Sequence, residues 1–380
     1  MDGRLRDGTV YAGDDARHRF FDSRGYGRSL TAPERDEWGS SGVALSRVEA
    51  AHLLARGDLD AVRADGRRLD FRAFLADAAD SGVLLRYLVY ADLRERGFYL
   101  SPARDGWPNT AGWDADGVDF VVYPRGNGPS DGEIGYRVRV VGERTPVAVA
   151  DLPGVLAVVD EESDVTYLGV DRPDLAGNAA AAPPATAGGV LLADRAVLWD
   201  PPAALYQEAF YGQPLPGREP EAALQLSLVE AAHLAGHGAV DLDARDGDGG
   251  PAGETDGTLP PVDAYADPAT SYGATVARGR AVEGERFDRR LRTYAALRDR
   301  GLVPKTGFKF GADYRTYADF DGVDDLSHSE LLFRVLPGDA TRTPRDLALD
   351  VRLAHGVRKR MVFALVDRAV EYRVVERMTP

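Results

Sequence analysis

Apolar residues recur at helical spacing in two segments that have nearly the same sequence. These segments are LSRVEAAHLLARG (45–57) and LSLVEAAHLAGHG (226–238). Each is followed along the chain by a second amphipathic pattern, LLRYLVYADLRERG (84–97) or RRLRTYAALRDRG (289–301). Both of these patterns end in a glycine, the residue that most often closes a helix. The spacing therefore predicts a pair of helices in each half of the chain.

Shorter runs of apolar and β-branched residues follow each predicted helix pair and indicate strands. The first half offers GVDFVVYP (117–124) and GYRVRVV (135–141). The second half offers TGFKFGADYRTY (306–317), SELLFRVL (329–336), MVFALVD (361–367) and VEYRVVER (370–377). A helix over about 344–360 is predicted between the second and third of these runs.

The same segments in the same order indicate a tandem duplication. A loop rich in Asp, Gly and Pro, from 243 to about 269, is interpreted as an insertion in the second copy. The predicted fold class is α+β, with a small N-terminal module and a second module in each copy. The expected boundaries are 1–82 and 83–171 for the first copy, 172–188 for a linker, and 189–285 and 286–380 for the second copy.

Length and composition point to a globular intracellular protein with more than one core. The chain has 380 residues, of which 44% are hydrophobic, and it has no cysteine, which excludes disulfides and Cys-ligated metal sites. Its first residues, MDGRLRDGTV, lack the apolar core of a signal peptide, and no apolar run is long enough to span a membrane. We expect a cytoplasmic location without membrane attachment.

The formal net charge of -15 argues, taken alone, against a polyanionic partner. However, an excess of Asp and Glu with Arg in place of Lys is also expected of a halophilic protein, in which salt near 1 M shortens the Debye length to about 3 Å. Local charge is then more informative than global charge. Between Arg342 and Arg377 nine basic residues stand against five acidic ones. The C-terminal segment is thus a basic island on an acidic chain.

Three residues that could carry chemistry occur together only in the second copy. DYRTY (313–317) aligns with DFVVY (119–123), so Tyr317 matches Tyr123, but His328 and Lys359 have no counterpart in the first copy. Lys359 is also one of only three lysines in the chain, beside Lys305 and Lys309. We interpret the first copy as a scaffold and the second as the working unit.

The segments KTGFKFGADYRTY, SHSELLFRV and RLAHGVRKRMVFALVD, in that order and spacing, closely resemble the catalytic half of archaeal tRNA-splicing endonucleases. A fused chain of two copies is similar to the homodimeric class of that family, in which the first copy is degenerate. The resemblance implies a nuclease module with a mixed sheet like that of restriction endonucleases. It also implies excision of introns from precursor tRNA at bulge-helix-bulge motifs, by a homodimer.

The resemblance assigns a role to each of the three residues. Tyr317 is the general base for the ribose 2'-hydroxyl, His328 the general acid for the leaving 5'-oxygen, and Lys359 the cation that stabilises the phosphorane. No metal or other cofactor is expected. A tyrosine base, with a reference pKa near 10, needs help from a cation such as Lys359. Family members also hold a flipped bulge base between two arginines, which Arg352 and Arg373 match.

Other readings of the sequence remain open. The chain could be a non-catalytic RNA-binding or structural subunit that kept the fold. A metal-dependent nuclease would need paired carboxylates near Lys359, where only Asp346 and Asp350 are found. His233 and His237 form an HxxxH pair, but a structural histidine fits better because the first copy keeps only one of the two. Lys305 and Lys309 are interpreted either as phosphate contacts or as plain surface residues.

Overall fold

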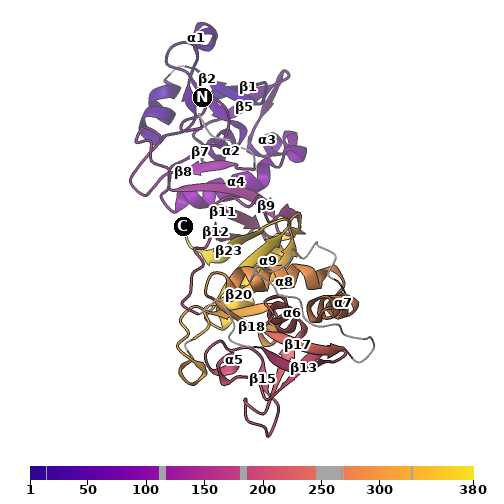
Figure 1. Cartoon of the computed structure of the whole chain (residues 1–380). Coiled ribbons are helices and arrows are strands. Elements are labelled where there is room, and N and C mark those ends of the chain that lie inside the picture. Colours follow the sequence, from indigo (N-terminus) through magenta and orange to yellow (C-terminus); the bar gives the residue numbers. More distant parts are fainter. Residues whose placement is uncertain (14, 111–116, 180–185, 245–266, 268, 327) are drawn as a thin grey trace. The chain divides into compact units, whose positions relative to one another are not determined.

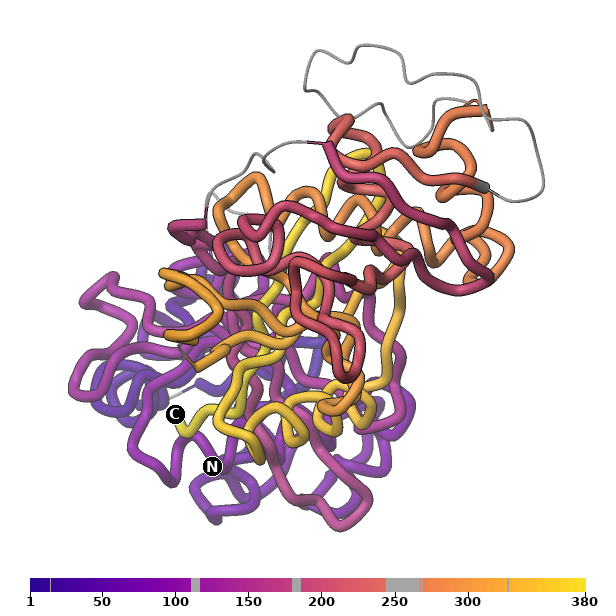
Figure 2. Tube along the Cα trace, turned by 60° about the horizontal axis from the view of Figure 1, so that its bottom comes forward, coloured from indigo at the N-terminus to yellow at the C-terminus, as the bar shows by residue number. Residues whose placement is uncertain are grey.

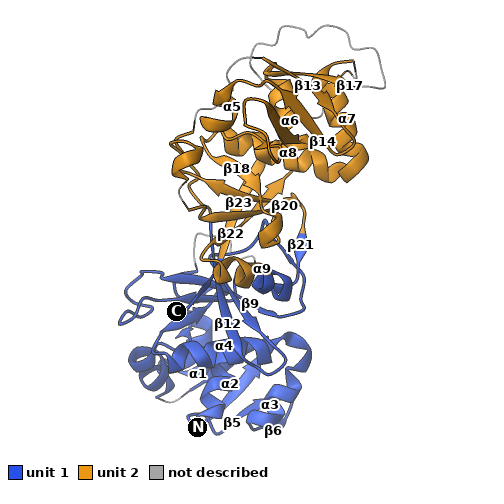
Figure 3. Cartoon of the chain, turned by 90° about the horizontal axis from the view of Figure 1, so that it is seen from below, with its two compact units in different colours: residues 1–171, 341–349, 376–380 blue, residues 172–340, 350–375 orange. Residues whose placement is uncertain are grey.

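The chain divides into two units, which Figure 3 colours separately. The first contains residues 1–171, 341–349 and 376–380, and the second contains 172–340 and 350–375. This computed structural model describes all residues except 14, 111–116, 180–185, 245–266, 268 and 327. Most of the predicted insertion (243–269) and part of the predicted linker (172–188) therefore lie outside the described residues.

The first unit begins with a sheet in which the first strand of the chain is central. Among the described residues it has six strands in the order β3-β4-β2-β1-β5-β6. Strand β1 (Asp2–Arg6) pairs antiparallel with β2 (Thr9–Ala12) and parallel with β5 (Ala61–Ala64). The other strands are β3 (Arg28–Ser29), β4 (Val43–Ser46) and β6 (Arg67–Leu69). The helices here are η1 (Arg17–Asp22), α1 (Ala32–Trp38), α2 (Arg47–Ala55), α3 (Phe71–Asp77) and η2 (Ala79–Ser81).

The second sheet of this unit is covered by α4 (Val83–Glu95), as Figure 1 shows. Its strands follow the order β7-β8-β9-β11-β12, with β9 and β11 parallel. They span β7 (Leu100–Pro102), β8 (Phe120–Val122), β9 (Tyr136–Gly142), β11 (Val155–Val159) and β12 (Val165–Asp171). Two short strands, β10 (Val147–Ala148) and β21 (Thr341–Arg342), pair antiparallel beside them.

The second unit repeats the order of sheet, helices and sheet. Its first sheet has the order β15-β16-β14-β13-β17, and the helices α6, α7 and α8 pack on one another. The strands are β13 (Ala187–Leu191), β14 (Arg195–Trp199), β15 (Gln213–Pro214), β16 (Ala223–Ser227) and β17 (Val240–Ala244). The helices are α5 (Ala203–Gln207), α6 (Leu228–Gly236), α7 (Ser271–Glu283) and α8 (Glu285–Arg298).

The last strands of the second unit lie in the order β18-β19-β20-β22-β23. Strand β20 (Leu331–Pro337) pairs parallel with β22 (Arg360–Val366), and α9 (Pro344–Gly356) connects them. In Figure 2 this pairing is visible as the yellow C-terminal segment running beside an orange strand. The other elements are β18 (Val303–Thr306), η3 (Phe308–Phe310), β19 (Tyr314–Tyr317), η4 (Val323–Asp325) and β23 (Val370–Met378).

Helices α2 and α6 begin with the same capping arrangement. Ser46 accepts a hydrogen bond from the backbone of Glu49, whose carboxylate accepts one from the backbone of Ser46 in return. Ser227 and Glu230 form the same reciprocal pair at α6. Such a capping box satisfies two backbone donors that the helix itself cannot. Both glutamates are buried, which fixes the start of each helix against its sheet.

Most predicted elements are confirmed, with two corrections. The predicted helix pairs are α2 with α4 and α6 with α8, and Gly97 and Gly301 adopt positive φ just after α4 and α8. The predicted strand 306–317 is interrupted by the turn η3, because Gly311 adopts a left-handed conformation with φ of 68°. The predicted helix 344–360 ends at Gly356, and Arg358 has a φ of 58°.

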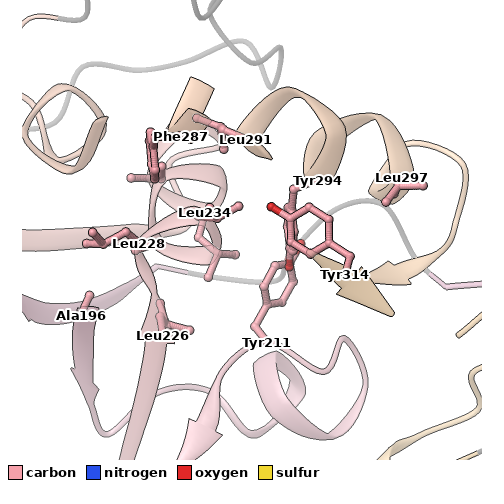
Figure 4. Close-up of a cluster of buried hydrophobic side chains, with 14 of the residues drawn as sticks. Ala196, Tyr211, Leu226, Leu228, Leu234, Phe287, Leu291, Tyr294, Leu297 and Tyr314 are labelled. Atoms are coloured by element: carbon pink, nitrogen blue, oxygen red, sulfur yellow. The ribbon is translucent and has the colours of Figure 1, made fainter. Parts of the chain in front are cut away.

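The core of the second unit supports strand β19 from behind. Tyr211, Tyr294 and Tyr314 cluster beside apolar residues of α6 and α8, as Figure 4 shows. The described part of 172–188 also contacts this unit, because Gly177 and Ala179 donate backbone hydrogen bonds to Arg300 and Gly301. None of the helices in the described residues is long and apolar enough to cross a membrane.

Candidate active site

Strand β19 divides its side chains between two environments. Residues two apart on a strand share a face, so Arg315 and Tyr317 lie opposite Tyr314. Tyr314 is buried, with its ring centroid 5.9 Å from that of Tyr294, and its hydroxyl donates to the carbonyl of Arg290 over 3.0 Å. This packing against α8 fixes the strand and presents Arg315 and Tyr317 on the other face.

Tyr317 is held in a small apolar cluster on that face. Its ring centroid lies 6.0 Å from that of Phe210, which in turn stacks on Phe320 at 5.8 Å. Val303 lies opposite Tyr317 on the neighbouring strand β18 and belongs to the same cluster. Tyr317 is only 6% exposed. The ring is therefore fixed by its neighbours.

The predicted helix over 344–360 included Lys359, but the structure places this residue in the segment between α9 and β22. Its backbone N–H donates to the carbonyl of Ala354 over 2.9 Å, which closes the helix end. The Nζ atom donates to the side chain of Ser329 over 2.7 Å and to the carbonyl of the same residue. It also lies 5.5 Å from the centroid of the Phe310 ring. Partial burial and the positive charge of Arg315 lower the pKa of this ammonium, against a smaller opposing effect of Glu330.

The contact with Ser329 brings Lys359 to the segment that contains His328. His328 immediately precedes Ser329 and is exposed. On the other side, Arg315 links Lys359 to Tyr317 through shared rings, since its guanidinium carbon lies 5.9 Å from the Phe310 centroid and 5.6 Å from the Tyr317 centroid. Tyr317 and Lys359 are thus connected through Arg315 and Phe310 within the second unit, whereas His328 is connected to them only through its sequence neighbour Ser329.

The two arginines predicted to hold a base differ in exposure. Arg352 is exposed on α9. Arg352 and Lys359 are seven residues apart, which predicts that they share one face of the helix expected over 344–360. This prediction is wrong, because Lys359 lies beyond the end of α9. Arg373 is only 6% exposed, and its guanidinium bonds to Glu371 and to the carbonyl of Tyr372. Stacking by Arg373 remains a prediction, and it would require this side chain to leave its buried position.

Lys305 is neither a phosphate contact nor a surface residue, the two interpretations drawn from the sequence, because it is buried in an ion pair. It is 6% exposed, and Nζ lies 2.7 Å from the Glu230 carboxylate and within 3.1 Å of the carbonyls of Phe210 and Gly212. Burial disfavours the Glu230 carboxylate, but Lys305 and the backbone donors outweigh it and lower the pKa of that carboxyl. Lys309 is exposed on the turn η3. The two lysines therefore have different surroundings, although they are close in sequence.

Tyr123, which aligns with Tyr317 in the sequence, has different surroundings. Tyr123 is fully buried, and its hydroxyl bonds to Ser101 over 2.8 Å and to Asn109 over 3.2 Å. Burial raises the pKa of this phenol. Its hydroxyl is occupied by structural hydrogen bonds, unlike a hydroxyl available to substrate.

The other chemical candidates have structural surroundings. His233 is buried between Tyr211 and Tyr294, with ring centroids at 6.0 and 5.2 Å, so the structural interpretation of the HxxxH pair holds. Asp350 forms an ion pair with Arg334. In the ranges that the structure describes, no three His, Cys, Asp or Glu side chains are grouped as a metal site would need.

Comparison with known proteins places this site in a family. The sequence model of the tRNA intron endonuclease catalytic C-terminal domain matches residues 287–373, and that of the N-terminal domain matches 1–75 and 187–253. A tRNA-splicing endonuclease of Natronomonas pharaonis is 55% identical over 383 residues, covering 100% of both chains. The chain belongs to the tRNA-splicing endonuclease family.

Two further tRNA-splicing endonucleases show how far this similarity extends. The protein of Haloarcula marismortui is 53% identical over 384 residues, with 100% of both chains covered. That of Methanosarcina mazei is 35% identical over 393 residues, covering 99% of this chain and 98% of the other. The predicted resemblance is thereby confirmed, and halophilic relatives agree with the acidic composition. Tyr317, His328 and Lys359 all lie within the match to the catalytic domain of tRNA-splicing endonucleases.

Proposed function

We propose that this protein is an endoribonuclease that excises introns from precursor tRNA. The observation that carries the proposal is that the match to the family's catalytic domain, 287–373, contains the strand face with Tyr317 and the bonded pair Lys359 and Ser329. The relatives named tRNA-splicing endonuclease support the same activity over the whole chain.

The proposed reaction needs no group beyond those of the protein and the RNA. The 2'-oxygen attacks the phosphorus as Tyr317, in its ionised form, takes the 2'-hydroxyl proton. The bond from phosphorus to the 5'-oxygen breaks as protonated His328 gives its proton to that oxygen. The products are a 2',3'-cyclic phosphate and a 5'-hydroxyl, and exchange with water restores both residues. Lys359 stabilises the charge on the phosphorane oxygens.

A tandem duplication explains why only one such site is expected per chain. The N-terminal domain model matches twice, once in each half, whereas the catalytic match lies in the second half alone. The identical capping of α2 and α6 supports the same interpretation. The first copy is then a scaffold in which the hydroxyl of Tyr123 forms structural hydrogen bonds. This proposal includes a nuclease sheet of the restriction endonuclease type. It also includes a division of the chain into four modules, at 1–82, 83–171, 189–285 and 286–380.

Intron excision requires two cuts, so a two-fold homodimer would supply two sites at a fixed separation. The dimer would recognise the bulge-helix-bulge shape through backbone geometry and flipped bases. Arg352 is the better placed of the two predicted stacking residues, because its side chain is exposed. A cytoplasmic location goes with this substrate.

The proposal is tested by incubating the purified protein with an intron-containing precursor tRNA in high salt, with and without EDTA. The expected result is two cuts at the bulges, unaffected by EDTA, with cyclic phosphate and 5'-hydroxyl ends. Light scattering should give twice the chain mass. Binding without cleavage would favour the alternative, a non-catalytic subunit. Cleavage that EDTA abolishes and Mg²⁺ restores would favour a metal-dependent nuclease.

A further inference from the structure

Arg315 lies beside the proposed base and has no hydrogen-bond or ion-pair partner among the residues that the structure describes. It precedes Tyr317 by two residues on β19, and so it lies on the same face of the strand. Its guanidinium contacts the rings of Tyr317 and Phe310, while Lys359 lies over the same Phe310 ring. The cations of Arg315 and Lys359 therefore both lie near the Phe310 ring, next to the proposed base.

The guanidinium of Arg315 is unusual in this acidic chain, which has 61 Asp and Glu against 46 Lys and Arg. Its Nε atom is buried and without a hydrogen-bond partner among the described residues. The Nε atoms of Arg290 and Arg334 also lack a hydrogen-bond partner, but these two arginines form ion pairs, with Glu283 and Asp350. Arg315 forms no ion pair with the residues that the structure describes. Arg298, which is almost fully buried, donates to the hydroxyl of Tyr294 and the carbonyl of Ala209.

An unpaired cation in this position indicates an anionic ligand. A buried donor without a partner destabilises the protein, and a hydrogen bond to a ligand would remove that cost. Lys359 and Arg315 also repel each other, since the charge of Arg315 contributes to lowering the pKa of Lys359. Glu330 is the carboxylate that acts in the opposite direction on Lys359. A phosphate between the two cations would be attracted to both.

We propose that Arg315 is a further catalytic residue, which binds a non-bridging oxygen of the RNA phosphate that is cut. The planar guanidinium suits a phosphate because it donates two parallel hydrogen bonds. Arg315 forms no covalent bond and moves no proton in this step. It adds a second positive charge, beside Lys359, where charge develops on the phosphorane. This inference rests on the proposed function, because it concerns the same phosphate.

The test measures single-turnover cleavage of precursor tRNA by Arg315→Leu, Arg315→Lys and a control, Arg368→Leu. Arg368 is exposed in the turn between β22 and β23, and its replacement removes the same charge. We expect Arg315→Leu to lose about 10²-fold in rate, as for other single transition-state donors, and Arg315→Lys to recover part of it. Arg368→Leu should cleave as the wild type does. Thermal unfolding of all three variants shows whether they fold.

A second measurement separates phosphate binding from a structural role. The substrate carries a neutral methylphosphonate at the cut linkage, which removes one charged oxygen. If Arg315 binds that oxygen, the 10²-fold gap between wild type and Arg315→Leu should shrink to below about tenfold on this substrate. An equal gap on both substrates would overturn the proposal, because Arg315 would then act only by supporting Tyr317.

Failure of this inference can be told apart from failure of the proposed function. If the wild type does not cleave precursor tRNA, the proposed function itself is wrong. If the wild type cleaves, Tyr317→Phe and Lys359→Ala are inactive, and Arg315→Leu cleaves at the normal rate, only the role of Arg315 is wrong.

Discussion

Lys359 donates a hydrogen bond from Nζ to the side chain of Ser329 over 2.7 Å. Ser329 directly follows His328, so this bond joins the ammonium to the segment that contains the proposed acid. It also holds Lys359 in place after α9 has ended at Gly356. The position of the cation therefore depends on a side chain that is not expected to take part in the reaction.

Ser329→Ala should weaken catalysis without removing it. The variant loses one hydrogen bond to Lys359 but keeps the bond to the backbone carbonyl, so we expect at most about a tenfold loss of rate. Lys359→Ala removes the cation and should cost about 10²-fold or more. Single-turnover cleavage at saturating enzyme measures both. Equal losses in the two variants would show that Ser329 has a direct role.

Tyr317→Phe removes one hydroxyl and should reduce the cleavage rate by at least about 10²-fold, because the base is lost. The ring remains, so packing on Phe210 and affinity for precursor tRNA should be unchanged. Tyr123→Phe is the matched control from the first copy. It should lower stability by about 1 kcal/mol, through the lost bonds to Ser101 and Asn109, and leave the rate intact. A slow Tyr123→Phe enzyme that is fully folded would contradict the scaffold role of the first copy.

Lys305→Met should destabilise the fold, whereas Lys309→Met should not. Lys305 neutralises the buried Glu230, and removing one partner of a buried ion pair costs about 3 to 5 kcal/mol. Lys309 is exposed, so its replacement should change the free energy of unfolding by less than about 0.5 kcal/mol. Urea unfolding at constant salt measures both values. Similar stabilities of the two variants would mean that the ion pair is unimportant.

The loss in free energy of unfolding caused by Lys305→Met should depend on pH. In the wild type the pKa of Glu230 is lowered, so its stabilisation is present above the ordinary value of 4.5 and is lost as the pH falls through the lowered pKa. In the variant, only burial and hydrogen bonds affect the Glu230 carboxyl. Glu49 is in the same situation, and burial raises the pKa of its carboxyl. Protonation would then relieve the buried charge, so the destabilisation should be smaller at pH 5 than at pH 7. A cost that does not change with pH would contradict this assignment.

Arg352→Ala should weaken substrate binding more than it slows the reaction step. Stacking of one base contributes about 1 to 3 kcal/mol, so we expect the Kd for precursor tRNA to rise at least fivefold. Arg345→Ala, an exposed arginine on the same helix, is the control. The difference between the two variants should disappear when the bulge nucleotides are abasic. A persistent difference would show that Arg352 contacts the backbone instead of a base.

Local sequence patterns were sufficient for the regular elements of the fold. The paired helices were predictable because apolar spacing, capping serines and closing glycines agree in each copy. The parallel pairing of β1 with β5 was not, because it joins residues about 60 positions apart and depends on long-range packing. The helix over 344–360 was predicted, but its end at Gly356 was not, because a left-handed Arg358 gives no sequence signal comparable to a glycine.

Sequence spacing and the family resemblance singled out Tyr317, His328 and Lys359 as candidates, and their roles stay a prediction. Their arrangement in space could not be predicted from the sequence. The burial of Lys305 could not be read from its neighbours in sequence, since its partner Glu230 lies 75 positions away. Arg315 was overlooked, although its position two residues before Tyr317 on a strand places both side chains on one face.

The central claim is that the protein itself activates the ribose 2'-hydroxyl without metal. The most direct measurement is single-turnover cleavage in EDTA of a precursor tRNA that carries a single 2'-deoxynucleotide at one cut site. We expect this site to be bound but not cut, while the unmodified site in the same molecule is cut at the normal rate. Cleavage at the deoxynucleotide would show that the 2'-hydroxyl is not the nucleophile.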